Sequence, residues 1–107
     1  MIKVYAIGNL TKDPEMRWTA SGKAVTEFSI ASNEGYGEKR TTEYLDCQCW
    51  DKLAESVAEN LTKGRKVFVE GRWKTDSWED KTGQKRTRIR VIANNVEYLD
   101  RPTRALR

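Results

Sequence analysis

The residues of this chain best suited to chemistry are basic and aromatic, and they concentrate between residues 63 and 90. This stretch holds ten Lys and Arg residues against four Asp and Glu residues, a surplus of +6 that exceeds the net charge of +4 of the whole chain. Its two halves are strand-like and flank a polar tip, residues 79–85. The pattern predicts a hairpin that can grip a polyanion such as a nucleic acid strand.

Flat aromatic side chains accompany these cations. Tyr44 and Trp50 occupy one strand-like run, Trp78 lies in the hairpin, and Trp18 and Tyr36 lie in loops. An unpaired base that stacks on such a ring gains roughly 1 to 3 kcal/mol, and neighbouring Lys and Arg residues neutralise phosphates, so that affinity falls steeply with added salt. Because the bases of a duplex are already stacked, this combination favours a single strand.

The run from residue 40 to 50 alternates between an apolar and a polar face. The apolar face carries Leu45, Cys47 and Cys49 and is predicted to face the core. The other face presents two candidate stacking rings beside polar residues and is predicted to be hydrated: Tyr44, Asp46, Gln48 and Trp50.

Three arginines share one face of the last strand-like run, residues 86–99. Arg86, Arg88 and Arg90 stand at alternate positions and repel one another unless an anion lies between them, which favours the binding of a polyanion. Trp73, in contrast, lies in the run from residue 66 to 78 on the same face as Val67 and Val69. It is predicted to belong to the core, together with Phe28.

The same inventory gives little support to catalysis. The chain has no histidine, so the usual proton carrier at neutral pH is missing. Cys47 and Cys49 lie two residues apart on one strand face, which suits buried side chains, and one C-x-C pair does not complete a metal site. Glu79 and Asp80 lie in the polar tip, where we expect mobile, solvated carboxylates. We therefore expect no enzymatic activity, no metal and no cofactor.

Strand signals dominate the chain, and one helix interrupts them. The helix is predicted over residues 51–63, with Asp51 as its cap and Lys63 and Gly64 at its end. Gly8, with Asn9, marks a bulge or a close backbone approach near the end of the first strand, and Gly71 marks a sharp bend. The predicted strands are residues 2–10, 24–33, 40–50, 66–78 and 86–99, with a short extended piece at 15–19.

Five strands with one helix between the third and the fourth predict an all-β OB-fold, a five-stranded Greek-key barrel. A split sheet crossed by one helix is the alternative. The length allows one domain, assigned to residues 1–99, and residues 100–107 are predicted to form a short, basic, disordered tail. The chain lacks a secretion signal and an apolar run of about 18 residues, which predicts a cytoplasmic protein with no membrane contact.

Four segments of the chain are highly specific when taken together. They are GNL-x-x-DPE-x-R at 8–17, KG at 63–64, V-x-VEG at 67–71 and W-x-D-x-x-G-x-x-R at 78–86. On these segments the chain, from about residue 2 to residue 99, resembles the DNA-binding domain of bacterial-type single-stranded DNA-binding proteins. The resemblance implies an OB-fold, usually assembled as a homotetramer, around which single-stranded DNA wraps with little sequence preference in replication, recombination or repair.

The resemblance also implies which residues meet DNA. The stacking aromatics fall on Tyr36, Tyr44, Trp50 and Trp78. The basic contacts fall on Lys52, Lys63, Lys74 and Arg86, more loosely on Arg17 and Arg72, and the arginine row adds Arg88. The first strand, residues 2–8, would pair with its twin across a two-fold axis.

The chain departs from the family pattern at several positions. Asp46 and Asp76 stand where members often carry a basic residue, and Leu45 stands where an interface histidine is common, which makes a dimer the second expectation after a tetramer. The long tail with an acidic end that recruits enzymes in the family does not follow residue 99, so partners of that kind are not expected. The alternative function is that of a protein-interaction accessory module, of primosome type, with weak DNA affinity.

Overall fold

The computed structural model describes residues 1–100 and contains six strands, one α-helix and one 3-10 turn over that range. The strands are β1 (Lys3–Leu10), β2 (Glu15–Trp18), β3 (Ala24–Glu34), β4 (Thr41–Trp50), β5 (Lys66–Glu79) and β6 (Lys85–Tyr98). The helix α1 (Asp51–Asn60) lies between β4 and β5, and the 3-10 turn η1 (Gly37–Lys39) lies between β3 and β4. The five predicted strands are confirmed, and the short extended piece forms the additional strand β2.

The strands form one sheet in the order β1-β5-β6-β4-β3-β2, and a further pairing of β1 with β3 closes it into a barrel. Every pairing is antiparallel except that of β4 with β6. At the closure, a Cβ added to Gly8 would lie 2.6 Å from the carbonyl oxygen of Ala31, so the predicted close backbone approach is confirmed. This closed barrel, with its helix after the third long strand, is an OB-fold.

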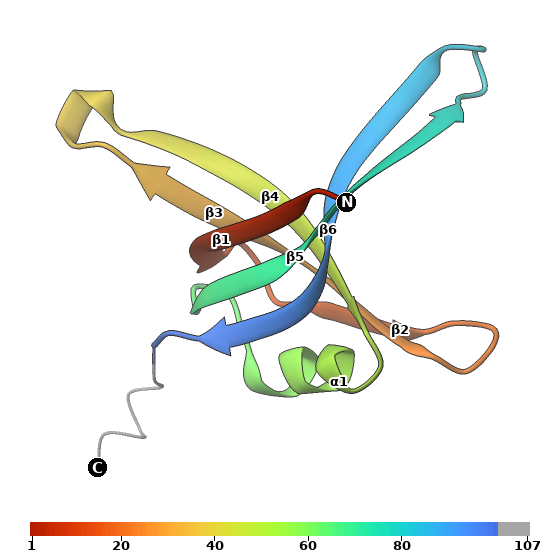
Figure 1. Cartoon of the computed structure of the whole chain (residues 1–107), viewed down its shortest axis with the longest axis horizontal. Helices are drawn as coiled ribbons and strands as arrows, with labels where there is room; N and C mark the ends of the chain where they lie inside the picture. The colour runs from red at the N-terminus through yellow and green to blue at the C-terminus, as the bar shows by residue number, and fades with distance from the viewer. Residues whose placement is uncertain (101–107) are drawn as a thin grey trace.

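One hydrophobic core fills the barrel, and α1 covers one end of it (Figure 1). The helix contributes Ala54 and Val57, and the hydroxyl of Thr26 on β3 donates to the carbonyl oxygen of Ala54 at 2.7 Å. The predicted inward faces of β3 and β4 are confirmed. The core includes Leu10, Phe28, Ile30, Cys47, Cys49, Ala54, Val57, Leu61, Val67, Val69 and Val91.

The helix is shorter than the predicted span of residues 51–63. It ends at Asn60, so Lys63 and Gly64 lie beyond its last turn. The predicted capping role of Asp51 is wrong, because the N-cap is Trp50 and no side chain caps the helix. Since β4 runs directly into α1, Asp51 is the residue that turns the chain, and it does so with a φ of 59° in the left-handed region.

Two hairpins extend beyond the barrel as arms. In Figure 1 the arm of β3 and β4 points to the upper left and the arm of β5 and β6 to the upper right. The β5–β6 pairing shifts register between Glu70 and Gly71, and a Cβ on Gly71 would collide with the carbonyl oxygen of Ile92. Glycine is therefore required where the pair changes register, beside the start of the arm.

The end of the described chain is held to the barrel. Asp100, which the sequence assigned to the tail, accepts hydrogen bonds from Arg65 Nε at 2.9 Å and from the backbone N–H of Lys66 at 3.1 Å. The rest of the predicted tail, residues 101–107, lies outside the described residues. Within residues 1–100, α1 is too short and too polar to cross a membrane, and no other helix there qualifies.

Candidate nucleic-acid interface

One face of the sheet points away from the core and carries most of the predicted contact residues; we call it the outer face. The β4–β6 pairing joins its parts, because Gln48 pairs with Ile92 and an oxygen of Asp46 lies 3.8 Å from Arg88. The face is made of Tyr44, Asp46, Gln48 and Trp50 on β4, Arg72, Lys74, Asp76 and Trp78 on β5, and Arg86, Arg88, Arg90 and Ile92 on β6.

The four predicted stacking rings differ in exposure. Tyr36, near the tip of the β3–β4 arm, is 93% exposed, and Tyr44 and Trp78 are 72% and 49% exposed. Trp50 is half-buried, and its indole Nε1 donates to Gln48 Oε1 at 3.3 Å. The rings are thus spread over both arms and the barrel between them. A ligand that reaches all of them must be an extended chain and not a small molecule.

The arginine row is neutralised by the protein's own carboxylates. Arg86 Nε lies 2.8 Å from Asp80, an Arg88 nitrogen 3.8 Å from Asp46, and Arg90 Nε 2.9 Å from Asp76. The repulsion expected from three alternate arginines is therefore relieved within the molecule, and their presence on one face is weaker evidence for a polyanion than the sequence alone indicated.

Two other cations of the outer face are unpaired. Arg72 and Lys74 are exposed, and neither takes part in an ion pair among residues 1–100. Arg17 on β2 lies opposite Val25, which in turn pairs with Trp50, but its guanidinium is 3.1 Å from Glu27. Arg72 and Lys74 are therefore the cations of this face that can meet a phosphate without first giving up a partner.

Two predicted basic contacts lie away from the outer face. Lys52 is in the first turn of α1, and Lys63 is in the turn beyond its end, where the backbone N–H of Lys63 donates to Asp13 at 2.8 Å. A ten-residue helix spans about 15 Å, so the two lysines stand at opposite ends of the helical side of the barrel. A strand that contacts both must pass along that side.

The tip of the β5–β6 arm is ordered, contrary to the solvated tip that the sequence predicted. One oxygen of Asp80 accepts hydrogen bonds from the Thr82 hydroxyl at 2.6 Å, the Thr82 N–H at 2.9 Å and the Gln84 N–H at 3.0 Å, and the other accepts from Arg86 Nε. The bonds from Thr82 and Arg86 lower the pKa of Asp80 to about 2. Asp80 thereby fixes the turn beside Trp78 and Arg86.

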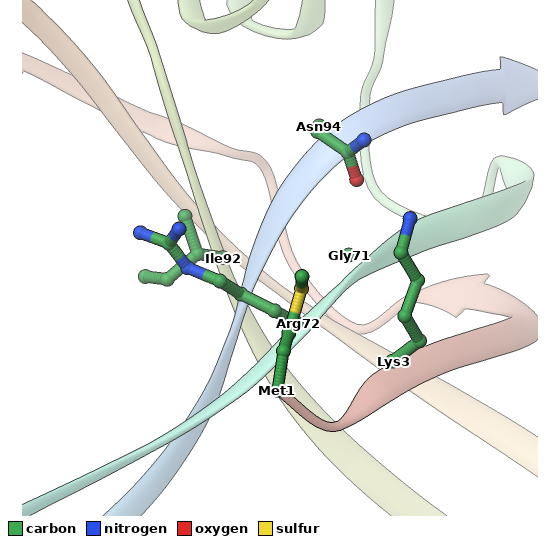
Figure 2. Close-up of a pocket in the computed structure, with 6 residues that line it drawn as sticks. All are labelled: Met1, Lys3, Gly71, Arg72, Ile92 and Asn94. Atoms are coloured by element: carbon green, nitrogen blue, oxygen red, sulfur yellow. The ribbon is translucent and has the colours of Figure 1, made fainter.

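A hollow of about 320 Å³ continues the outer face toward the N-terminus. Its walls are Met1, Lys3, Gly71, Arg72, Ile92 and Asn94. Figure 2 shows the Lys3 side chain directed toward Asn94, while the guanidinium of Arg72 extends the other way, beside Ile92. Sequence reasoning missed Lys3, although its alternation with Val4 on the first strand could have placed it on the outward side.

Two predictions of side-chain environment are wrong. Gln48 is buried instead of hydrated, because β6 pairs beside it and its amide lies 3.4 Å from Glu27. Trp73 is 42% exposed instead of buried, because it lies at the edge of an open hollow of about 440 Å³ that Ala6 and Ile30 also line, which leaves part of its side chain in contact with solvent. Its indole N–H donates to the Thr75 hydroxyl at 3.0 Å.

The two cysteines carry no nucleophilic chemistry in this setting. Both are free and buried, as predicted. Burial raises the pKa of each thiol to about 12, and for Cys47 the neighbouring Asp46 adds to the effect. The reactive thiolate is therefore scarce at neutral pH.

An OB-fold with aromatic and basic side chains on one sheet face defines a class of nucleic-acid-binding domains. Residues 1–99 match the model of the Single-strand binding protein family, and the chain belongs to that family. It is 43% identical over 100 residues to a Single-stranded DNA-binding protein of Mycobacterium tuberculosis, a match that covers 87% of this chain and 61% of that protein.

Other relatives carry similar names. The Single-stranded DNA-binding protein 1 of Chlorobaculum tepidum is 40% identical over 103 residues, covering 91% of this chain and 64% of the relative. The Single-stranded DNA-binding protein of Deinococcus radiodurans is 42% identical over 106 residues, covering 94% of this chain and 35% of the relative. The chain therefore spans about three fifths or less of the length of these proteins.

Proposed function

We propose that this chain binds single-stranded DNA with little sequence preference, by stacking bases on aromatic rings and neutralising phosphates. In this role it protects exposed strands during replication, recombination or repair in the cytoplasm, at the nucleoid. It acts as a binding protein and not as an enzyme. The names of its relatives support this proposal, as does its family.

The observation that carries the proposal is the composition of the outer face. Tyr44, Trp50 and Trp78 lie on the same side of the sheet as Arg72 and Lys74, two cations without an ion pair in the described part of the chain. Rings with an exposed flat surface accept any base, because every base has a π face, and the cations follow the backbone. A surface built only for protein contact has no need of this combination.

The first strand supports a homo-oligomer, with a tetramer expected before a dimer. One edge of β1 pairs with β5 along residues 3–9, whereas the other edge pairs with β3 only at Asn9 and Leu10. Tyr5 and Ile7 are exposed on this strand, and Tyr5 stacks on Phe68 with 6.2 Å between ring centroids. An open edge beside exposed apolar side chains suits a second copy of the chain.

Truncation of exposed rings tests the stacking role. Tyr44→Ala and Trp78→Ala are each expected to weaken oligo-dT binding by about 1 to 3 kcal/mol, because each removes one stacking surface. The measurement is fluorescence anisotropy of a labelled oligo-dT at fixed salt. Trp50 is less suitable, because its half-buried ring also supports the barrel.

Trp18→Ala is the matched control. Trp18 is 59% exposed on β2, but it lies on the opposite side of that strand from Arg17. Its loss is expected to leave binding unchanged. If the Tyr44 and Trp78 variants bind oligo-dT with the same affinity as the control, stacking on the outer face is refuted. That result would favour the alternative of an accessory module that binds other proteins.

A further inference from the structure

Two carboxylates lie among the arginines of the outer face. Asp46 on β4 lies 3.8 Å from Arg88, and Asp76 on β5 lies 2.9 Å from Arg90. Asp76 is also the cross-strand partner of Arg88, so that Arg88 is flanked by a carboxylate on each side. A phosphate that approaches this row meets pairs of near-zero net charge instead of free cations.

The contacts of these two pairs are loose. The Arg88 contact is long, and the carboxylate of Asp46 is held instead by the Ser29 hydroxyl, which donates to it at 2.6 Å. Arg90 Nε is close to Asp76 but its N–H is not directed at the carboxylate, and this buried nitrogen has no hydrogen-bond partner among residues 1–100. Neither arginine is therefore locked to its carboxylate by a directed hydrogen bond, so a phosphate oxygen can replace the carboxylate as partner.

The pair at the tip differs from these two. Arg86 donates a directed hydrogen bond to Asp80, and that carboxylate also organises the turn. Its removal would disorder the tip, whereas Asn at position 46 would still accept the Ser29 bond. The loose pairs can therefore be altered without dismantling the arm.

We propose that Asp46 and Asp76 are positioning residues that hold Arg88 and Arg90 on the outer face and restrain DNA binding, so that phosphates engage these arginines only by exchange with the carboxylates. The two aspartates thus set the affinity and its salt dependence. This inference rests on the proposed single-stranded DNA binding. On this proposal, the two aspartates weaken the hold of the arginines on phosphates, so that a bound strand can still dissociate.

Neutral, nearly isosteric substitutions test the inference. Asp46→Asn and Asp76→Asn are each expected to bind oligo-dT about two- to fivefold more tightly at moderate salt, because a surface ion pair of ordinary strength no longer competes. The plot of log K against log salt should also become steeper by about 0.7 for each arginine released, since more counterions leave the strand.

The control is Glu97→Gln, which makes the same change in net charge at an exposed position near the end of β6, away from the arginine row. It is expected to leave both affinity and salt slope near the wild-type values. Thermal unfolding of all variants shows whether they remain folded. If Asp46→Asn does not fold, Asp76→Asn tests the inference by itself.

The outcomes separate the two proposals. Tighter binding and a steeper salt slope in the folded aspartate variants alone support the inference. If the wild type binds oligo-dT but the aspartate variants match Glu97→Gln or bind more weakly, the inference is overturned and the proposed function stands. Absence of oligo-dT binding by the wild type and by every variant overturns both.

Discussion

Cys47 and Cys49 illustrate how strand parity determines the chemistry of single residues. Both side chains point into the core from β4, and burial raises the pKa of each thiol to about 12 from an ordinary value of 9.0. The neighbours on the opposite parity, Tyr44 and Asp46, face outward. The alternation of side chains along the ten residues of β4 thus places inert thiols on one face and candidate DNA contacts on the other.

Thiol reactivity follows from this burial. At pH 8 the folded protein is expected to resist alkylation by iodoacetamide, because the thiols of Cys47 and Cys49 stay protonated and covered, whereas the urea-unfolded chain should be alkylated at both. Mass spectrometry distinguishes the states. Equal labelling rates in the two states would contradict the burial of the thiols.

The pH dependence has a defined sign. Between about pH 9 and 12 the folded state holds thiol protons that the unfolded state releases, so the free energy of unfolding should fall as pH rises through this window. Asp80 acts in the other direction: its lowered pKa stabilises the folded state above about pH 4, and this contribution is lost as pH falls toward 2.

At the scale of the elements, the start of α1 depends on one residue with a left-handed backbone, Asp51. Asp51 adopts a φ of 59° where β4 turns into the helix, a conformation that glycine takes without steric cost. Asp51→Gly is therefore expected to raise the free energy of unfolding by up to about 1 kcal/mol, measured by urea denaturation at constant protein concentration.

Glu55→Gly provides the contrast for that substitution. Glu55 is an exposed residue in the interior of α1, where glycine costs about 1 kcal/mol. The change in the free energy of unfolding is therefore expected to be positive for Asp51→Gly and negative for Glu55→Gly. A loss of stability in Asp51→Gly similar to that in Glu55→Gly would show that the left-handed conformation carries no strain.

The elements were largely predictable from sequence because their signals are local. Two-residue alternation defined β3 and β4, and an apolar stripe defined α1. Bounds were less predictable where elements adjoin: nothing local to Asp51 indicates that β4 leaves no room for a capping residue. Trp73 follows core parity, but its exposure depends on the hollow that it borders between distant strands, which no local pattern indicates.

The candidate site was predictable only in part, because some of its contacts join residues that are far apart in the sequence. The exposed rings of Tyr44 and Trp78 follow from parity and from the resemblance. The partners of the arginine row do not, because Asp46 reaches Arg88 from a strand 42 positions earlier in the chain. Ion pairs between strands depend on register, and sequence alone does not provide the register of β4 against β6.

At the scale of the whole molecule, the open edge of β1 leads to a prediction about assembly. Exposed Tyr5 and Ile7 lie on this incompletely paired strand, which favours association, and the tetramer that we propose predicts a mass by light scattering of four times the chain mass of 12.4 kDa. Ile7→Glu should lower the mass by placing a charge in that interface.

Met16→Glu is the control for assembly, since it adds the same charge to an exposed position of β2. It is expected to keep the wild-type mass. A wild-type mass equal to one chain at micromolar concentration would contradict the assembly, and an unchanged mass in Ile7→Glu would place the interface elsewhere.

The central claim is that the outer face binds single strands by stacking and by charge. The most direct measurement is a titration of the wild-type protein with oligo-dT at several salt concentrations, followed by intrinsic tryptophan fluorescence, with a duplex of equal length as comparison. We expect saturable quenching, an affinity that falls steeply with salt, and a clear preference for the single strand. No quenching at low salt, or equal affinity for the duplex, would contradict the claim.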